Sequence, residues 1–454
     1  MQNLCTRLAK KGRARVIAGG VEAFSGRHVL LLQGPIGPFF ARLARDLERV
    51  GARVSKFNFN GGDWLFYPGG TTYFGTMEAW PQWLATRMAA LSIDQVFLFG
   101  DCRPIHRVAH RVATAMGIDV GVFEEGYLRP DFITLERHGV NGNSPRRYNP
   151  DAFRTPPGRE KPPIQVPIQP VSRSYWPMVA WGICYFITAS LTRWLFHYQH
   201  HRPIRVLSAL PWLRSPLRKV WFQLAERGMT ERLTGEWSGR FFLVPLQVYN
   251  DAQVVCHAST GGVPGFIADT IASFGRAAPD DVVLVFKHHP MDRGYCDYTR
   301  AIRRAARAAG CADRVVYMHD QHMPTILPHC RGTVVINSTA GLAAVGCGCP
   351  TITLGAAIYD MPGLTYQGPL DRFWTEAQDD RPDAALYECY RAELIAQTQI
   401  NGNFYRRLDP TMSATGLIWT STTQPRHSPE IVPFPIKGSS TAALLANPPE
   451  RATI

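Results

Sequence analysis

The stretch HVLLLQGPIGPFFARLARDLERVGARVSKF, residues 28–57, indicates the fold class of this chain. It begins with an apolar run that has the length of a buried strand, and a glycine- and proline-rich loop follows. Residues 39–50 then repeat apolar side chains at helical spacing, Gly51 ends this helix, and residues 53–57 resume a strand pattern. A strand, a helix and a second strand in this order predict parallel strands joined by a crossover helix.

The same alternation recurs along the chain in two series. In the first series we expect further strands at 95–99 and 120–123, with a helix at 104–116 between them. The second series has the strands 241–248, 282–287, 314–318, 333–336 and 351–354 and the helices 263–274, 298–309, 324–328 and 339–345. Apolar strands that alternate with helices predict an α/β protein with two Rossmann-like, doubly wound domains, as in the GT-B architecture among others.

The domain organisation follows from this pattern. The chain of 454 residues is longer than the roughly 100–200 residues of a single domain. We expect an N-terminal Rossmann-like domain in residues 1–150, a linker and Trp-rich helical insertion in 151–239, a C-terminal Rossmann-like domain in 240–402, and a tail in 403–454. The tail is rich in Pro, Ser and Thr, and we expect part of it to pack back on the first domain.

Composition, charge and the absence of certain motifs indicate which kinds of ligand this protein can bind. The formal net charge of +13 favours an anionic partner, such as nucleic acid, lipid headgroups or a phosphorylated substrate, although a basic surface can also serve solubility alone. No helix-turn-helix, RRM or zinc-finger pattern is present, so we expect no nucleic-acid partner. G-x-G-x-x-G and G-x-x-x-x-G-K-[ST] are also absent, which argues against dinucleotide binding and P-loop chemistry. The ten cysteines form no C-x-x-C pair, which predicts a reduced, cytosolic protein without disulfides.

One segment points towards a membrane surface. Residues 174–192, SYWPMVAWGICYFITASLT, carry no charge, but Pro177, Gly182 and several polar residues make them a poor spanning helix. Amphipathic aromatic side chains and cations gather in this segment and after it: Trp176, Trp181, Tyr185, Trp194, Trp212, Arg193, Arg202, Arg205, Arg214, Arg218 and Lys219. The combination is typical of an element that lies on an anionic bilayer, and the alternative is a set of ordinary buried helices.

Polar side chains stand at the ends of four expected strands. Ligands of open parallel sheets bind beyond the carboxyl ends of the strands, so these side chains are candidate site residues. They are Glu124 and Glu125 after the strand at 120–123, Gln247, Asp251 and Gln253 around the end of 241–248, Lys287, His288, His289 and Pro290 at the end of 282–287, and Asn337, Ser338 and Thr339 after 333–336.

The last of these groups has the character of a phosphate site. An Asn-Ser-Thr run that opens a helix of small residues presents hydroxyls and unpaired backbone N–H groups, which bind phosphate well. Lys287 and His289 end another strand with cationic or hydrogen-bond-donating groups, which strengthens this interpretation. The alternative is that the run is a plain helix N-cap.

The two glutamates indicate acid–base chemistry. Because adjacent glutamates cannot both point into a core, we expect one to face the interdomain cleft and the other to bond to a backbone amide or an arginine. A carboxyl group in a partly dry cleft has a raised pKa and can act as general acid or base. Asp251 could reach the same cleft, and two carboxylates across a sugar carbon suit glycosyl transfer with retention. Alternatively, Asp251 only caps the helix that follows it.

These motifs resemble those of known transferases. The order E-E-G, H-P and S-T is similar to the motif set of CMP-sugar-dependent GT-B glycosyltransferases. Six phrases between residues 27 and 369 more closely resemble the capsule polysaccharide biosynthesis/export family, which contains the KpsS-type (LipB-like) and KpsC-type (LipA-like) transferases of β-linked 3-deoxy-D-manno-octulosonic acid (Kdo). The phrases are LLLQGPIGPFF, VFEEGYLRPDFITLE, GVNGNS, VPLQVYNDAQ, FKHHP and NSTAGLAA.

The resemblance implies a donor, CMP-β-Kdo, and retention through a covalent Kdo adduct. It maps the nucleophile to Asp251 and the acid/base to the E-E-G pair, of which we prefer Glu125. The other implied donor-binding residues are Lys287 and His289 for the phosphate or the Kdo carboxylate, Ser338 and Thr339 for the CMP phosphate, and Gln247, Gln253, Pro290 and Asn337 beside them. Because hydrogen-bond donors neutralise the charge of the departing CMP, no metal and no other cofactor is expected.

The resemblance also implies an acceptor and a location. A single transferase unit and the Trp-rich basic segment favour the KpsS type, whose members start a poly-Kdo linker on a (lyso)phosphatidylglycerol-type lipid at the inner face of the bacterial inner membrane. We therefore expect that lipid, an anionic membrane surface and other capsule assembly proteins as partners, with peripheral attachment on the cytoplasmic side. The alternatives are a GT-B transferase that uses another nucleotide sugar, and a non-enzymatic component of polysaccharide export.

Overall fold

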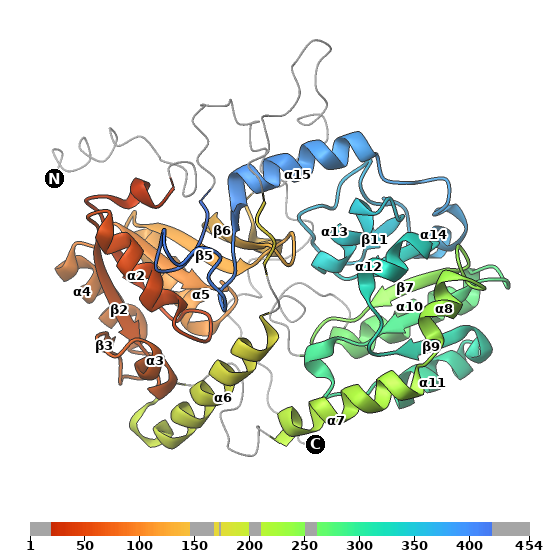
Figure 1. Ribbon diagram of the computed structural model, residues 1–454, viewed down its shortest axis with the longest axis horizontal. Coiled ribbons are helices and arrows are strands. Elements are labelled where there is room, and N and C mark those ends of the chain that lie inside the picture. Colours follow the sequence, from red (N-terminus) through yellow and green to blue (C-terminus); the bar gives the residue numbers. More distant parts are fainter. Residues whose placement is uncertain (1–19, 146–167, 172–173, 199–209, 250–260, 420–454) are drawn as a thin grey trace, which may run out of the picture.

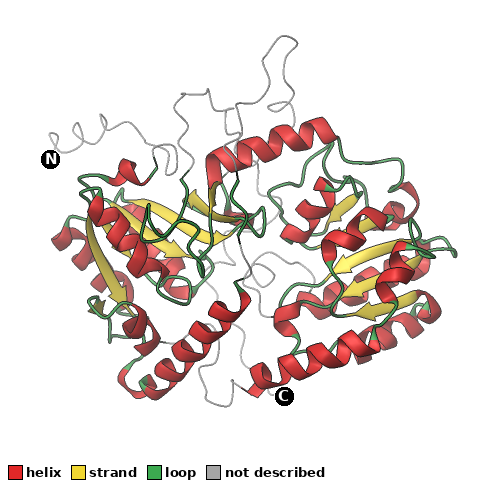
Figure 2. Cartoon of the chain, viewed as in Figure 1, coloured by secondary structure: helices red, strands yellow, loops and turns green. Residues whose placement is uncertain are grey.

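The chain folds into two lobes, each built on one β-sheet with helices on both faces (Figure 1, Figure 2). The computed structural model describes residues 20–145, 168–171, 174–198, 210–249 and 261–419. A seven-stranded sheet lies in the first lobe and a five-stranded sheet in the second. The predicted α/β, GT-B-like fold class, with two doubly wound domains and a helical insertion between them, is confirmed.

The first sheet has the strand order β12-β6-β5-β4-β1-β2-β3. Strands β1 to β5 run parallel, whereas β6 and β12 are antiparallel to their neighbours. The strands are β1 (His28–Leu31), β2 (Arg53–Asn58), β3 (Thr71–Thr72), β4 (Gln95–Phe99), β5 (Asp119–Glu125), β6 (Phe132–Arg137) and β12 (Gln399–Asn401). The helices of this lobe are η1 (Val21–Phe24), α2 (Phe39–Arg49), α3 (Gly61–Phe66), α4 (Trp80–Leu91), α5 (Pro104–Ala115) and η2 (Asn141–Asn143).

Burial on both faces explains the apolar run that opens the fold. All four residues of β1 are buried, as expected for a central parallel strand covered by helices on each side. Successive side chains enter different cores: Leu30 packs in the cluster that holds Trp80 of α4, and Leu31 packs in the cluster that holds Leu43 of α2. The helical spacing of residues 39–50 is therefore the core-facing stripe of α2.

Strand β5 is longer than the sequence indicated. The expected strand stopped at Phe123, but β5 continues through both glutamates to Glu125. The chain then turns back as β6, which pairs antiparallel with β5 in a hairpin that the sequence analysis did not predict. Gly126 is needed in this turn, because a Cβ atom there would lie 2.0 Å from the carbonyl oxygen of Phe132. The two carboxylates therefore stand on regular strand backbone rather than on a loop.

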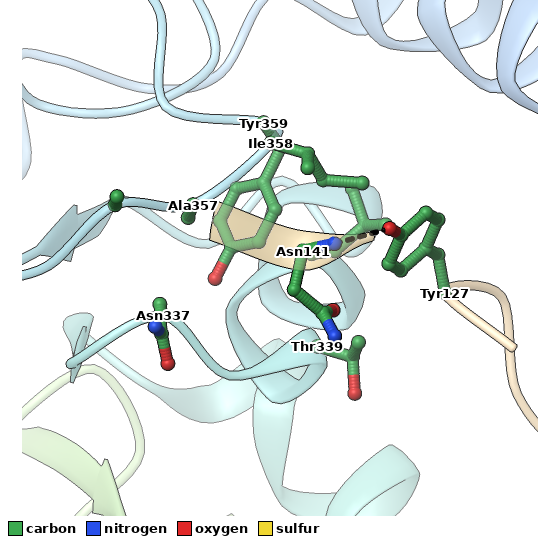
Figure 3. Close-up of a pocket in the computed structure, with 9 residues that line it drawn as sticks. Tyr127, Asn141, Asn337, Thr339, Ala357, Ile358 and Tyr359 are labelled. Carbon is green, nitrogen blue, oxygen red and sulfur yellow. Dashed lines mark hydrogen bonds between the residues drawn. The ribbon is translucent and has the colours of Figure 1, made fainter. Parts of the chain in front are cut away.

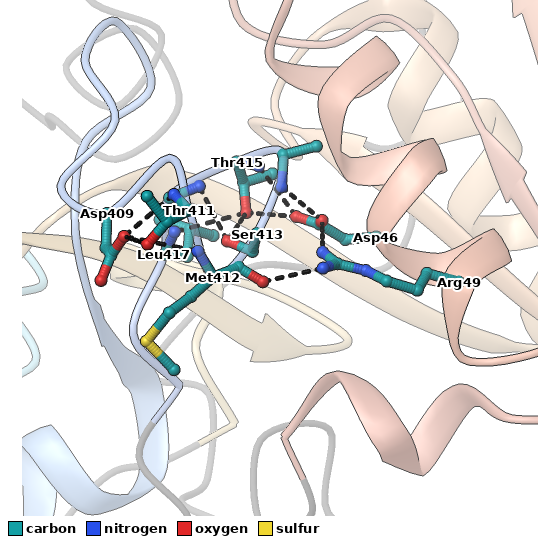
Figure 4. A network of polar contacts seen from close by, with 10 residues as sticks. Asp46, Arg49, Asp409, Thr411, Met412, Ser413, Thr415 and Leu417 are labelled. Atoms are coloured by element: carbon teal, nitrogen blue, oxygen red, sulfur yellow. Dashed lines mark hydrogen bonds and ion pairs between the residues drawn. The ribbon is translucent and has the colours of Figure 1, made fainter.

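The predicted domain boundary at residue 402 needs correction. Helix α15 (Ala384–Thr398) leads the chain out of the second lobe, and β12 then pairs with β6 in the first sheet. Beyond β12, the carboxylate of Asp46 accepts hydrogen bonds from the backbone N–H groups of Ala414 and Thr415 (2.6 and 2.9 Å; Figure 4). Residues 399–419 thus belong to the first lobe, because strand pairing and a buried carboxylate hold them there. Residues 420–454 lie outside the described part of the chain.

The second sheet is wholly parallel, with the strand order β11-β10-β7-β8-β9. Its strands lie where the sequence placed them: β7 (Phe241–Pro245), β8 (Val283–Lys287), β9 (Val315–Met318), β10 (Gly332–Val335) and β11 (Thr351–Thr353). The helices are α8 (Met229–Thr234), α10 (Gly262–Ala277), η6 (Pro290–Asp292), α11 (Thr299–Ala308), η7 (Ala312–Arg314), α12 (Met323–Ile326), η8 (Leu327–His329), α13 (Thr339–Gly346) and α14 (Leu370–Glu376).

The Trp-rich insertion is helical, as predicted. It contains α6 (Tyr175–Leu191), η4 (Arg193–Leu195) and α7 (Leu210–Ala225). Helix α6 packs against α3 of the first lobe, and α7 lies along the second lobe (Figure 1). Of the helices in the described part of the chain, none combines the length and the apolar character that crossing a bilayer requires.

Candidate active site

Two adjoining cavities lie where the strand ends of the two lobes face each other. The smaller has a volume of about 120 Å³ and the larger of about 550 Å³. Both cavities are lined by Arg129 of the first lobe and by His289, Ser338 and Thr339 of the second lobe. The sequence-predicted groups of the two lobes are therefore brought together in one cleft.

Most of the predicted site residues line these cavities. Around the smaller cavity stand Glu124, Glu125, Gln247, His289, Asn337, Ser338 and Thr339. The larger cavity adds Lys287, His288 and Pro290. The predicted nucleophile Asp251 and its neighbour Gln253 lie outside the described residues, so their placement stays a prediction.

The two glutamates have different surroundings. Glu124 accepts a hydrogen bond from the backbone N–H of Glu125 through Oε1 (3.0 Å), which is the amide contact expected for one member of the pair. Burial raises the pKa of Glu125 above its ordinary value, and the guanidinium of Arg129 opposes this effect only in part. A carboxyl group with a raised pKa takes up a proton more readily, which is the property that a general acid or base requires.

His289 is a neutral hydrogen-bond donor rather than a cation. Burial lowers its pKa to about 3, and the positive charges of Arg129 and Lys287 contribute to the shift. Nδ1 accepts the backbone N–H of Met291 (3.2 Å), which leaves the ring proton on Nε2. The imidazole therefore offers one N–H group to an anion in the cleft without a charge of its own.

Lys287 supplies a cation from the end of β8. Its side chain is buried but lines the larger cavity. Among the described residues its ammonium group has no hydrogen-bond or ion-pair partner, although the nearby carboxylate of Asp320 acts electrostatically on it. Burial lowers the pKa of Lys287 and Asp320 raises it. An ammonium group in this position can neutralise a bound phosphate or carboxylate.

The Asn-Ser-Thr run caps helix α13, and its role in phosphate binding stays a prediction. Ser338 is the N-cap of α13, since its hydroxyl accepts the backbone N–H of Ala340 (3.2 Å). Ser338 and Thr339 line both cavities, and Asn337 lines the smaller one. The Nδ2 of Asn337 is buried without a hydrogen-bond partner among the described residues, and its Oδ1 accepts a hydrogen bond from Gln247 (3.0 Å). Asn337 and the start of α13 at Thr339 thus present donors to the smaller cavity.

Sequence reasoning missed residues that come from loops rather than strand ends. Arg129 lies in the turn between β5 and β6, where its Nε donates to the carbonyl oxygen of Gly126 (3.2 Å). Asn141 lines the smaller cavity, and its backbone N–H donates to the hydroxyl of Tyr127 (2.6 Å; Figure 3). The sequence carried a signal for both, because Arg129 stands three residues after Gly126 of the E-E-G motif and Asn141 lies in the phrase GVNGNS.

The side chains of the cleft can also be examined as possible metal ligands. Within the part of the chain that the structure describes, no three His, Cys, Asp or Glu side chains are grouped so that they could hold a metal ion. The donors that converge on the cleft are instead an ammonium, a guanidinium, an imidazole N–H and amide groups, which suit an anionic ligand.

Comparison with known proteins adds family relationships. Residues 94–405 match the model of the capsule polysaccharide biosynthesis protein family. The chain is 39% identical over 385 residues to the capsule polysaccharide export protein KpsS of Escherichia coli, covering 84% of this chain and 97% of that protein. It is 40% identical over 392 residues to the capsule polysaccharide modification protein LipB of Neisseria meningitidis serogroup B, covering 85% and 93%. Among solved structures, the β-Kdo 2,7-transferase of Thermosulfurimonas dismutans KpsC aligns with a TM-score of 0.41 at 11% identity, over 83% of this chain and 93% of that one.

Proposed function

Because this chain belongs to the capsule polysaccharide biosynthesis protein family, we propose that it is a retaining β-Kdo glycosyltransferase. In this proposal it moves Kdo from CMP-β-Kdo to a (lyso)phosphatidylglycerol-type lipid and so starts the poly-Kdo linker of a capsular polysaccharide. It works peripherally at an anionic membrane surface, on the cytoplasmic side of the inner membrane. The observation that carries the proposal is the meeting of Glu125 with a set of anion-binding donors across the cleft.

The donor CMP-Kdo fits the charges of the cleft. It carries two anionic groups, the phosphate of CMP and the carboxylate of the sugar. Lys287, the Nε2–H of His289 and the start of α13 can hold the phosphate and stabilise CMP as it leaves. Arg129 can pair with the sugar carboxylate on the side of the first lobe. The larger cavity, about 550 Å³, has the volume of a typical small-molecule site.

Retention needs two displacements at the anomeric carbon. In the first, the carboxylate of Asp251 forms a bond to that carbon while the bond to the CMP phosphate breaks and CMP leaves with the electron pair. In the second, an acceptor hydroxyl attacks the same carbon, the bond to Asp251 breaks, and Glu125 takes the hydroxyl proton. The raised pKa of Glu125 helps this second step, because the carboxylate is then a stronger base.

The test is incubation of the full chain with CMP-Kdo and a lysophosphatidylglycerol analogue, followed by mass spectrometry of the lipid. We expect a product heavier by one or more Kdo units. Loss of the general base in Glu125→Gln should lower the rate about 10²- to 10⁴-fold. An Asp251→Asn variant should stop turnover as well.

Two outcomes would refute the proposal. One is a lipid that gains mass from another nucleotide sugar but not from CMP-Kdo, which would indicate a different transferase. The other is full capsule production in cells that carry both Glu125→Gln and Asp251→Asn, which would indicate a non-enzymatic export component.

A further inference from the structure

The insertion between the lobes is free of acidic residues over a long stretch. From Lys161 to Ala225 the sequence contains no aspartate or glutamate. The same stretch contains Lys161, Arg173, Arg193, Arg202, Arg205, Arg214, Arg218 and Lys219. This segregation of charge exceeds what a general basic composition requires, since the whole chain has 36 acidic residues. Of these cations, Arg193, Arg214 and Lys219 are exposed in the described part of the chain, and clustered positive charge favours an anionic partner.

Helix α6 exposes an uncharged apolar stripe. Trp176, Ile183, Ile187 and Leu191 recur on one side of the helix, and their side chains are between 47% and 73% exposed. Trp194, in η4 just beyond the helix, continues the stripe and is 82% exposed. Large contiguous apolar surface of this kind is uncommon on soluble proteins and marks an interaction site.

Helix α7 has the same construction on the other lobe. Leu217, Val220, Trp221 and Leu224 stand at positions i, i+3, i+4 and i+7, and each is at least 50% exposed. These four residues therefore share one face of the helix. Two exposed cations, Arg214 and Arg227, lie on either side of this face at helical spacing. An apolar stripe with basic edges is the pattern of helices that lie in a membrane interface.

The opposite face of α6 is tied to the first lobe. The hydroxyl of Tyr185 accepts hydrogen bonds from Gln33 (3.1 Å) and Asn60 (2.8 Å) at the carboxyl ends of β1 and β2. Its ring packs so closely on Gly62 of α3 that a Cβ atom there would lie 2.5 Å away. The buried side of α6 is thus fixed, and the apolar stripe is left outside.

The opposite face of α7 is tied to the second lobe. Glu226, directly after the helix, accepts hydrogen bonds from the backbone N–H of His319 (2.8 Å) and from its Nδ1 (2.7 Å). Phe222 stacks on the same imidazole with ring centroids 3.5 Å apart. These contacts lie just beyond β9, so α7 moves with the lobe that holds Lys287.

We propose that the apolar faces of α6 and α7 form one docking surface, divided between the two lobes, that lies on an anionic lipid bilayer. Figure 1 shows both helices along the same edge of the molecule, one under each lobe. The role of this surface, which is to bring the cleft to a lipid acceptor, rests on the proposed function. The surface itself does not.

Charge favours a bilayer over a second copy of the chain. A symmetric dimer would place this basic surface against itself, and like charges across an interface are costly. Anionic headgroups instead complement the cations that flank α7, while the exposed Trp176, Trp194 and Trp221 suit the boundary between headgroups and acyl chains.

The test is co-sedimentation of the full chain with vesicles. We expect at least tenfold tighter binding to vesicles of mixed phosphatidylglycerol and phosphatidylcholine than to pure phosphatidylcholine, and weaker binding as salt is raised. Ile187→Asp on α6 and Trp221→Asp on α7 should each lower the partition coefficient about tenfold or more. In the double variant the partition coefficient should fall by roughly the product of the two single decreases, because the two helices bind the same bilayer as linked sites.

Matched variants separate the surface from the fold. Met116→Asp places the same charge on an exposed residue at the opposite end of the first sheet, and its binding should equal that of the unaltered chain. Arg214→Gln with Arg227→Gln should weaken binding to anionic vesicles about fivefold for each charge and leave binding to phosphatidylcholine unchanged.

Several results would overturn the inference. These are no preference for anionic vesicles, unaltered binding by Ile187→Asp or by Trp221→Asp, or a dimer in solution that Trp221→Asp dissociates while vesicles bind neither form. The proposed function fails separately: a chain that binds vesicles but transfers nothing from CMP-Kdo, even to a short-chain acceptor in solution, would contradict the transfer reaction and leave the docking surface standing.

Discussion

The environment that raises the pKa of Glu125 suits acid–base chemistry, but it also makes the folded protein less stable at neutral pH. The carboxyl group of Glu125 stands at the end of β5, where it is half-buried, and desolvation there raises its pKa. A raised pKa means that the folded state binds the proton more tightly than the unfolded state does. The folded protein is therefore favoured below the ordinary carboxyl pKa, and it loses that advantage as the pH rises through the raised pKa.

Replacing this carboxyl group with an amide should show how much stability the ionised carboxylate costs the folded protein at neutral pH. We predict that Glu125→Gln raises the melting temperature at pH 7, since an amide has no charge to bury, and that this gain disappears below about pH 4, near the ordinary glutamate pKa. Calorimetry at pH 7 and below about pH 4 measures the difference in melting temperature between the variant and the unaltered chain. A gain of equal size at both pH values would show that the charge of Glu125 is not the cause.

His289 should act without titrating in the working range. Because burial lowers its pKa to about 3, the imidazole stays neutral at pH 5 to 8 and donates through Nε2–H. We predict that His289→Ala lowers the rate of transfer about tenfold or more, whereas His289→Gln, which keeps a donor of similar reach, retains more activity. Neither the unaltered chain nor His289→Gln should show a titration near pH 6.5 in the pH–rate profile. A step at that pH that vanishes in His289→Gln would contradict the neutral role.

At the scale of elements, the hairpin of β5 and β6 is the feature that positions the site. It places both glutamates on regular strand backbone and Arg129 in the turn beyond them. The sequence reading extended only to Phe123, because two adjacent charges look like the end of a buried strand. Antiparallel pairing with β6 carries the strand further, since the ladder hydrogen bonds do not depend on the side chains.

Gly126 allows this hairpin to close. We predict that Gly126→Ala lowers the free energy of unfolding by roughly 1–3 kcal/mol, because the new Cβ would press on the carbonyl oxygen of Phe132. Gly182→Ala in α6 is the matched control: no atom lies within 4 Å of its added Cβ, and alanine favours a helix by roughly 1 kcal/mol. Denaturant unfolding measures both changes. Equal effects of the two substitutions would refute the steric argument.

The other elements differ in how well the sequence predicted them. Four of the five strands of the second sheet were predicted to within one residue at each end, because each is a short apolar run between turn signals, whereas the predicted strand 241–248 extends three residues beyond β7. Helix α15 was missed although its buried residues Leu386, Tyr390 and Leu394 recur every four positions, since half-buried apolar and polar residues are mixed between them. Strand β12 has only three residues, too few for any alternation to be visible.

At the scale of the whole molecule, the end of the described chain ties the second lobe back to the first. After α15 crosses between the lobes, β12 joins the first sheet and residues 409–417 pack beside α2 (Figure 4). Asp46 holds this return: its buried carboxylate accepts hydrogen bonds from Thr415 Oγ1 (2.5 Å) and the backbone there, and pairs with Arg49.

Removal of that acceptor should loosen the connection. We predict that Asp46→Ala lowers the free energy of unfolding by roughly 3 kcal/mol, since buried N–H groups lose their partner, and exposes the segment around Met412 to proteolysis. Arg276→Gln, which breaks the exposed pair with Asp371, should cost no more than about 1 kcal/mol. Similar losses from both variants, or an unchanged pattern of proteolysis in Asp46→Ala, would contradict the assigned role.

The sequence by itself determined the two Rossmann-like lobes, the helical insertion, and the strand ends that carry Glu125, His289 and Ser338. Such features depend on local patterns, since the spacing of apolar residues and the residues that follow a strand are read along the chain. Only the tertiary structure decided that Arg129 and Asn141 enter the same cleft, that β12 returns to the first sheet, and that α6 and α7 belong to different lobes. Those relations join residues far apart in the chain, and they follow from packing and hydrogen bonding between elements, which no local pattern encodes.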